Sequence, residues 1–186
     1  MPTDSALLLE AISFAARKHQ GQFRKDGRTP YFAHVARVMM IARDRWGVTD
    51  PEVLAAAVLH DTIEDTTTDY DDLAKRFGRR VAELVVLLTK DKRLPEEERE
   101  AKYHAALAEG PLEAKLCKLA DTLDNLLDCQ SLSDKGRQRA IQRARHLLEV
   151  FDPSIPGQWR HTLEAVRQRI MTLEQQGCES ERALTG

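Results

Sequence analysis

The chain has 186 residues, with 28 Lys plus Arg, 30 Asp plus Glu and a formal net charge of -2. This length allows one domain with a sizeable core, and the balanced charge excludes a general basic surface for nucleic acid. Cys117, Cys129 and Cys178 lack a paired short spacing, which argues against a disulfide framework and a zinc knuckle. No apolar run approaches the roughly 18 residues that a membrane span needs. We therefore expect a soluble, cytoplasmic protein.

The spacing of apolar residues predicts one helix after another. The predicted helices cover about residues 5–19, 31–46, 51–65, 69–77, 79–90, 102–109, 112–128, 135–151 and 158–176. The run VAELVVLLT is rich in β-branched residues, but no partner strand is visible, so we predict a helix there as well. The sequence predicts an all-α, single-domain bundle of about eight to ten helices over residues 1–176. A flexible tail is expected at residues 177–186.

The segment LHDTIEDT is the strongest local signal for chemistry. His60 and Asp61 are adjacent, and Glu64 and Asp65 follow one helical turn later. On a continuous helix, His60 would share a face with Glu64, and Asp61 would share a face with Asp65. Charged side chains directly after an apolar run such as AAAVL are rarely buried unless they are paired or bind a metal. The alternative interpretation is a solvated acidic cluster at a helix end.

Two distant segments offer matching metal ligands. His34 lies in TPYFAHVARV, on a helix whose other faces are apolar, and Asp121 interrupts the apolar face of LCKLADTLDNLL. A lone His in such a place is more often a satisfied core residue, whereas a lone Asp is costly unless it faces a cation. Asn125 lies one turn after Asp121 on the same side. With His60 and Asp61, these ligands suit Mn²⁺ better than Fe²⁺, Co²⁺ or Zn²⁺.

The order His34, His60-Asp61 and Asp121 resembles the HD superfamily of metal-dependent phosphohydrolases. The segments AARKHQGQFRKDGRTPYFAH, LHDTIEDT and KLADTLDN are similar to the hydrolase domain of the RelA/SpoT family, especially its small stand-alone alarmone hydrolases. The resemblance covers about residues 8–128. It implies an HD-type helical bundle that removes pyrophosphate from the ribose 3′ position of ppGpp or pppGpp and leaves GDP or GTP. The chain is too short to hold a synthetase domain as well.

The resemblance also implies a role for each site residue. The Mn²⁺ ligands would be His34, His60, Asp61 and Asp121. The acidic pair that activates or positions the attacking water would be Glu64 and Asp65. The nucleotide contacts would be Arg24, Lys25 and Asn125. The Arg-Lys pair would offset the repulsion between a polyphosphate and the acids of the site, because guanidinium and ammonium groups bind phosphate strongly.

The chain departs from the family pattern at several places. Val35 follows His34 where many relatives have Pro, and Asp128 stands where longer relatives carry a small polar nucleotide contact. The region after Ser131 matches little, and the helix KGRQRAIQRARHLLEV lacks an expected aromatic residue. Recognition of the base and ribose therefore stays open. We expect His19 to pack against the RK loop or to hold it.

Other polar residues receive a structural interpretation. We expect structural roles for His104, His146 and His161. A solvated helix face is expected for Arg137, Arg139, Arg143 and Arg145, with a secondary phosphate contact or a subunit interface as the alternative.

Three functions remain open from the sequence. The preferred one is an alarmone 3′-pyrophosphohydrolase that binds a small nucleotide, with no nucleic-acid or membrane partner. The second is an HD phosphatase that acts on another nucleotide, such as NADPH or a deoxynucleotide. The third is a non-catalytic alarmone-binding protein, which the intact metal set and the intact Glu64-Asp65 pair disfavour. The sequence makes no prediction of oligomeric state.

Overall fold

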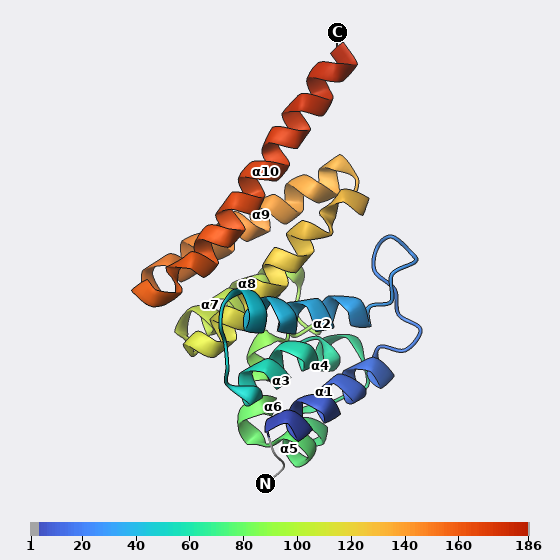
Figure 1. The fold of residues 1–186 in the computed structure, drawn as a ribbon, viewed down its shortest axis with the longest axis vertical. Coiled ribbons are helices and arrows are strands. Elements are labelled where there is room, and N and C mark those ends of the chain that lie inside the picture. Colours follow the sequence, from blue (N-terminus) through green and yellow to red (C-terminus); the bar gives the residue numbers. More distant parts are fainter. Residues whose placement is uncertain (1–3, 186) are drawn as a thin grey trace.

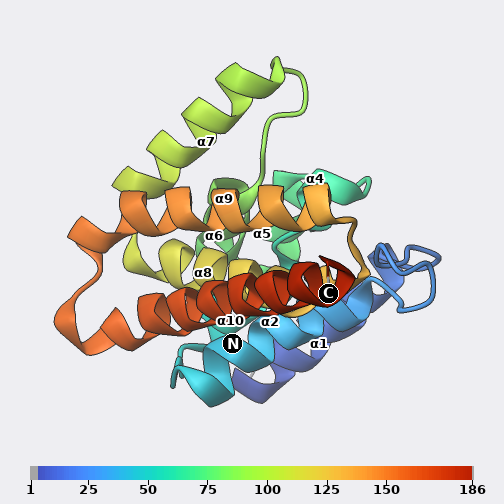
Figure 2. The ribbon, with the colours of Figure 1, turned by 90° about the horizontal axis from the view of Figure 1, so that it is seen from above.

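A computed structural model describes the backbone of residues 4–185 and the side chains of residues 5–176. The described part is built of helices packed in a bundle, which confirms the predicted all-α fold (Figure 1, Figure 2). The α-helices are α1 (Asp4–Lys18), α2 (Phe32–Met40), α3 (Pro51–Leu59), α4 (Thr62–Asp65), α5 (Tyr70–Phe77), α6 (Arg79–Leu88), α7 (Glu96–Glu109), α8 (Leu112–Leu127), α9 (Asp134–Phe151) and α10 (Arg160–Thr185). The run VAELVVLLT lies in α6 and α6's cap, so its helical prediction is correct.

Helix α3 lies in the middle of the bundle. Every residue from Val53 to Leu59 is buried, and the helix packs against α1, α2, α6 and α8. Its start follows the sequence prediction, because the side chain of Asp50 accepts a hydrogen bond from the backbone N–H of Glu52, and Pro51 opens the first turn. A helix that is apolar all round is stable only inside a bundle. The central position of α3 sets where the polar residues at its end must lie.

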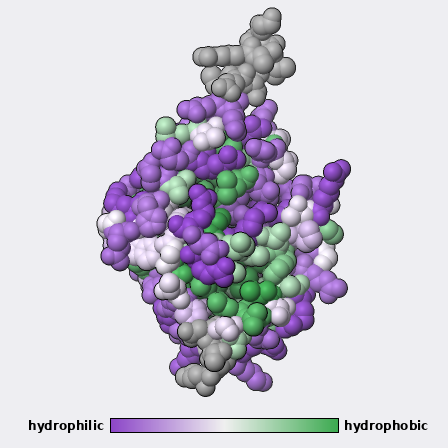
Figure 3. Space-filling model, in the orientation of Figure 1, coloured by the Kyte–Doolittle hydropathy of each residue, from purple (hydrophilic) through white to green (hydrophobic). Residues whose placement is uncertain are grey.

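The C-terminal helices cover α8. Helices α9 and α10 both pack against α8, and α7 packs against α9 (Figure 2). The face seen in Figure 3 is mostly hydrophilic with an apolar area across its middle and lower parts. No described helix is both long and apolar enough to cross a membrane. Helix α10 runs to Thr185, so the backbone of residues 177–185 within the predicted tail is helical, and the flexibility of residues 177–186 stays a prediction.

Three predicted helix boundaries are wrong by several residues, and one of them is the end of α10, which lies at Thr185 instead of residue 176. The predicted continuous helix over 51–65 ends at Leu59, and Asp61 adopts φ -96° and ψ 0° before α4 begins. The hydroxyl of Thr62 donates to the carbonyl of Leu59 at 2.7 Å, which helps to satisfy the end of α3. Helix α7 begins at Glu96 instead of Lys102, so the acidic segment forms its first turns. Acidic side chains are favourable there because the helix N-terminus carries partial positive charge.

The loop between α1 and α2 is tied down by its own hydrogen bonds. The backbone N–H of Arg24 donates to the carbonyl of Thr29 at 2.8 Å, beside an isolated antiparallel bridge between Phe23 and Pro30. Asp26 accepts from both backbone and hydroxyl of Thr29, at 2.9 and 2.6 Å. This network fixes the turn that carries the predicted nucleotide contacts.

Candidate active site

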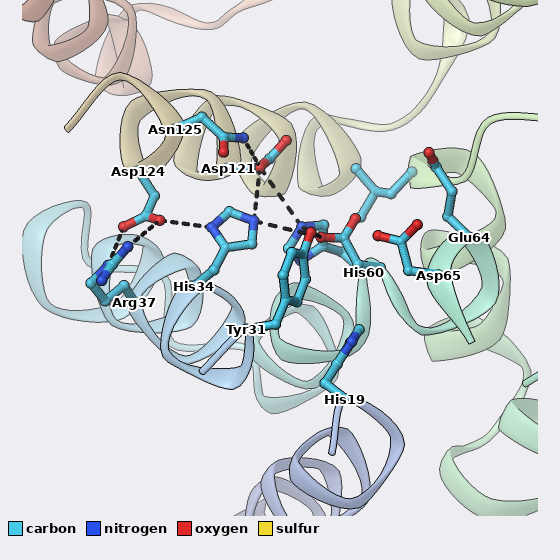
Figure 4. Close-up of polar contacts among 12 residues, drawn as sticks. His19, Tyr31, His34, Arg37, His60, Glu64, Asp65, Asp121, Asp124 and Asn125 are labelled. Atoms are coloured by element: carbon cyan, nitrogen blue, oxygen red, sulfur yellow. Dashed lines mark hydrogen bonds and ion pairs between the residues drawn. The ribbon is translucent and has the colours of Figure 1, made fainter. Parts of the chain in front are cut away.

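The structure brings the four predicted metal ligands together from three segments. His34 comes from α2, His60 and Asp61 from the turn after α3, and Asp121 from α8 (Figure 4). Nε2 of His34 lies 3.2 Å from Oδ1 of Asp121 and 3.5 Å from Oδ2 of Asp61. Nε2 of His60 lies 3.0 Å from Oδ2 of Asp61 and 3.8 Å from Oδ1 of Asp121. Both rings and Asp121 are buried. The break after Leu59 is what lets His60 and Asp61 face the same point.

Hydrogen bonds on the far side of each imidazole orient its Nε2 atom toward the carboxylates. Nδ1 of His34 lies 2.7 Å from Oδ2 of Asp124, and Nδ1 of His60 lies 2.8 Å from the carbonyl of Ala57. When Nδ1 carries the proton and donates, Nε2 presents a lone pair. Among the described side chains, the buried Nε2 of His60 has no hydrogen-bond partner. Lone pairs and carboxylate oxygens repel one another unless a cation joins them, so the residues fit a divalent metal ion.

Electrostatics at the cluster support the same conclusion. Donor atoms of His34, His60 and Asp121 lie within 4.8 Å of one another. Burial opposes protonation of His34, but hydrogen bonds to Asp121, Asp124 and Asp61 outweigh it and raise its pKa to about 10. Burial alone would raise the pKa of Asp121, yet Lys118 and the two imidazoles hold it well below its usual value. The carboxylates of the cluster therefore attract positive charge, which a proton on His34 supplies in the free protein and which a metal ion bound at the same Nε2 atom would supply instead.

Asp124 is a functional residue that the sequence analysis missed. Its side chain is fully buried, and its carboxylate joins His34 to Arg37. Nε of Arg37 donates to Oδ1 at 2.6 Å, and Nη2 donates to Oδ2 at 3.0 Å. A carboxylate behind a metal-binding imidazole fixes the ring and raises its basicity. Asp124 lies three residues after Asp121, and that helical spacing was the signal that could have revealed it.

Two further side chains orient the carboxylate ligands, and the sequence analysis missed both. The hydroxyl of Tyr31 donates to Oδ2 of Asp61 at 2.6 Å. Nζ of Lys118 donates to Oδ2 of Asp121 at 2.7 Å and leaves Oδ1 toward the imidazoles. Tyr31 lies three positions before His34, and Lys118 lies three positions before Asp121.

The acidic pair of α4 lies on the His60 side of the cluster, opposite Arg37 and Asp124 (Figure 4). Oε2 of Glu64 accepts a hydrogen bond from the backbone N–H of Lys90 at 3.0 Å, and burial raises the pKa of Glu64. Oδ1 of Asp65 accepts from Nζ of Lys92 at 2.7 Å. Both acids are only partly buried, so this side of the site is open to solvent and to a ligand.

The structure also places the predicted nucleotide contacts beside the predicted metal ligands. Nε of Arg24 donates to Oδ2 of Asp128 at 2.8 Å, and Nη2 donates to Oδ1 of Asn125 at 2.9 Å. Nδ2 of Asn125 donates to Oδ1 of Asp121 at 2.6 Å, which links the loop to the cluster. His19 holds the loop as expected, because its Nδ1 lies 2.8 Å from Oε1 of Gln22.

A cavity of about 260 Å³ extends from this cluster between α7, α8 and α9. Asp121, Asn125, Arg24 and Lys25 line one end of it. Apolar side chains also line it: Leu126, Cys129, Leu132, Ala140, Ala144 and Leu147. The sequence analysis expected structural roles for His104 and Arg143, but both line this cavity. A partly apolar cavity with convergent polar groups is the usual form of a small-molecule site.

Comparison with known proteins identifies the family. The family model HD_4, described as HD domain, matches residues 11–153. The chain belongs to the HD domain family. It is similar to a Xenopus tropicalis protein named guanosine-3′,5′-bis(diphosphate) 3′-pyrophosphohydrolase MESH1, with 44% identity over 73% of this chain and 76% of that protein. The Danio rerio protein of the same name is 38% identical over 92% of this chain and 94% of its own length.

A solved structure resembles this HD domain along nearly its whole length. It is described as a metazoan ortholog of SpoT that hydrolyzes ppGpp and plays a role in starvation responses. The TM-score is 0.79 at 36% identity, and the match covers 91% of this chain and 97% of that one. The HD match contains every predicted site residue, and the relatives are named hydrolases. The chain is therefore an HD-type hydrolase, as the sequence predicted.

Proposed function

We propose that this HD domain is a Mn²⁺-dependent hydrolase that removes pyrophosphate from the ribose 3′ position of ppGpp or pppGpp. One observation carries the proposal: Asp121 of the His34, His60, Asp61 and Asp121 cluster lines one cavity together with Arg24, Lys25 and Asn125, while the acidic pair of α4 lies on the His60 side of the cluster. The names of the relatives support the substrate, since those proteins act on guanosine-3′,5′-bis(diphosphate).

The proposed metal ligands supply two imidazole nitrogens and two carboxylates. Such a mixed donor set, without thiolate, suits a catalytic divalent ion such as Mn²⁺. When bound, the ion would supply Lewis-acid activation of the attacked phosphorus and of water. The protein keeps the donors ready, because Asp124, Tyr31 and Lys118 hold three of them from behind.

We assign the role of proton acceptor to Glu64. Burial raises its pKa, and a carboxylate with a raised pKa accepts a proton from water more readily than an ordinary one. The backbone N–H of Lys90 fixes one of its oxygens and leaves the other to act. Asp65, held by Lys92, would position the same water.

The nucleotide would be held by Arg24, Lys25 and Asn125. Arg24 is already fixed by Asp128 and Asn125, so little conformational entropy is lost when a phosphate binds. The same Asp128 carboxylate offsets part of the charge of Arg24, which favours the alternative of another nucleotide, such as NADPH or a deoxynucleotide. A panel of substrates separates the two.

A cytoplasmic location also belongs to the proposal. Cys117 and Cys129 are free thiols, both buried, as expected of a protein that works in a reducing compartment. The third cysteine, Cys178, lies outside the described side chains.

The test is incubation of metal-stripped protein with ppGpp after Mn²⁺ is restored, with products followed by anion-exchange chromatography. We expect GDP and pyrophosphate in equal amounts, and no products from Asp61→Ala. NADPH and deoxynucleotides are run in parallel. Turnover of one of these without turnover of ppGpp would overturn the alarmone assignment, and absence of turnover on all substrates from Mn²⁺-loaded protein would overturn the proposed enzyme activity.

A further inference from the structure

Two lysines meet on the side of the cavity formed by α7. Nζ of Lys90 lies 5.1 Å from the ring centre of Tyr103, and Nζ of Lys118 lies 5.4 Å from the same centre. The ring is buried and hydrogen-bonded through its hydroxyl to the carbonyl of Leu88, at 3.2 Å. Two ammonium groups placed against one fixed aromatic ring form a rigid positive site, because each gains a cation–π contact and neither can move far.

In this structure the ammonium group of Lys90 forms an ion pair with the carboxylate of Glu100. Both oxygens of Glu100 accept from Nζ of Lys90 at 2.8 Å, and the two side chains are only 21% and 24% exposed. Lys118 donates to a single oxygen, Oδ2 of Asp121, at 2.7 Å. The two carboxylate oxygens of Glu100 accept hydrogen bonds from the ammonium group of Lys90, as two oxygens of a phosphate group would. Glu100 therefore stands where an anionic ligand could replace it.

The charge of the cavity wall favours such a ligand. Five cationic side chains line the cavity: Arg24, Lys25, Lys90, Lys118 and Arg143. Three carboxylates line it: Glu100, Asp121 and Asp128. The wall is thus positive before any metal ion is counted, and it attracts a polyanion. The cations fall on two sides, the RK loop and the α7–α9 side, with the apolar lining available between them.

We propose that Lys90 and Lys118 form a second phosphate subsite, which takes the 5′-diphosphate of the nucleotide while the 3′-pyrophosphate lies at the metal ligands. The inference rests on the proposed function, since it needs a substrate with phosphates at both ends. His104 and Arg143 line the same part of the cavity and extend the subsite. Substrate binding exchanges the carboxylate of Glu100 for a phosphate group on Lys90.

The test measures binding, so it does not depend on turnover. The Mn²⁺-loaded chain is titrated calorimetrically with GDP, which carries the 5′-diphosphate, and with inorganic pyrophosphate, which represents the leaving group. We expect Lys90→Met to weaken GDP binding about tenfold, the usual loss for a charge-assisted hydrogen bond, and to leave pyrophosphate binding unchanged. Glu100→Gln should strengthen GDP binding, because the internal competitor loses its charge. Lys90→Arg should restore most of the affinity.

Matched controls come from the exposed face of α7. Lys102 and Glu98 pair with each other at 2.8 Å outside the cavity lining, so Lys102→Met and Glu98→Gln change the same charges without touching the subsite. Weaker pyrophosphate binding with unchanged GDP binding in Lys90→Met would overturn the assignment. Equal losses for both ligands, no loss for either, or an equal loss in Lys102→Met would overturn it as well. Lys90-dependent GDP binding in a protein that does not hydrolyse ppGpp would disprove the proposed function alone.

Discussion

The two sides of the candidate active site are built differently. On the His34 side, Asp124 is fully buried, and His34 and Arg37 hold both of its carboxylate oxygens at distances of 3.0 Å or less. On the Glu64 side, the acids of α4 are partly exposed, and Asp65 is restrained by Lys92, whose side chain is 54% exposed. The two sides are therefore suited to different tasks. Holding an ion requires fixed donors, whereas delivering water requires a carboxylate that solvent and substrate can reach.

The strongest test of this division removes a proposed ligand. We expect His60→Ala or Asp61→Ala to abolish both Mn²⁺ binding and hydrolysis, because the remaining donors no longer surround the ion. Metal content by mass spectrometry and product formation by chromatography measure the two losses. Full metal occupancy in either variant would contradict the assignment of these residues as ligands.

A substitution on the Glu64 side should lower turnover without changing metal binding. Glu64→Gln keeps the size of the side chain but cannot accept a proton, so we expect kcat to fall roughly 10²- to 10⁴-fold while Mn²⁺ affinity stays the same. The matched control is Glu83→Gln, because Glu83 is exposed on α6. Unchanged kcat would remove Glu64 from the proposed mechanism.

A substitution on the His34 side should instead lower the affinity for the metal ion. Asp124→Asn removes the charge behind His34, so we expect Mn²⁺ affinity to drop roughly 10- to 100-fold, as it does when such supporting carboxylates are lost. Calorimetric titration with Mn²⁺ measures it, and excess Mn²⁺ should restore much of kcat. Asp134→Asn at an exposed carboxylate of α9 serves as the control. If excess metal does not rescue activity, Asp124 does not act through the ion.

The smallest effect on kcat is expected for a substitution of Lys92, at the exposed edge of the Glu64 side. Lys92→Met leaves Asp65 without its ion pair, and exposed pairs contribute at most about 1 kcal/mol, so kcat should change less than roughly fivefold. Steady-state kinetics at low and high salt measure the change. A loss as large as that of Glu64→Gln would show that the open side depends on precise positioning after all.

The sequence predicted the all-α fold and named the four residues that converge, because residue type and helical spacing carry that information locally. It missed Tyr31, Arg37, Lys118 and Asp124, although each lies three residues from a predicted ligand. Side chains three residues apart share a helix face just as those four residues apart do. An acid next to a predicted ligand also reads as another solvated charge until its burial is known.

The far wall of the cavity could not be predicted in this way. It forms where α7 and α9 pack over α8, and although these helices follow one another in the chain, the way they pack is set by tertiary contacts that leave no local pattern. Arg143 therefore resembles the solvated residues around it on α9. The turn at His60 and Asp61 was missed for a related reason, since it depends on the Thr62 hydroxyl and on burial of the whole of α3.

Arg37 connects the buried His34 side of the site to the protein surface. Its side chain is 40% exposed, yet it binds Asp124, which in turn binds the ring of His34. A partner, a modification or a neighbouring charge that pulled on this guanidinium at the surface would loosen the imidazole two contacts away. The exposed guanidinium and the buried imidazole are thus connected by two contacts, without any opening of the bundle.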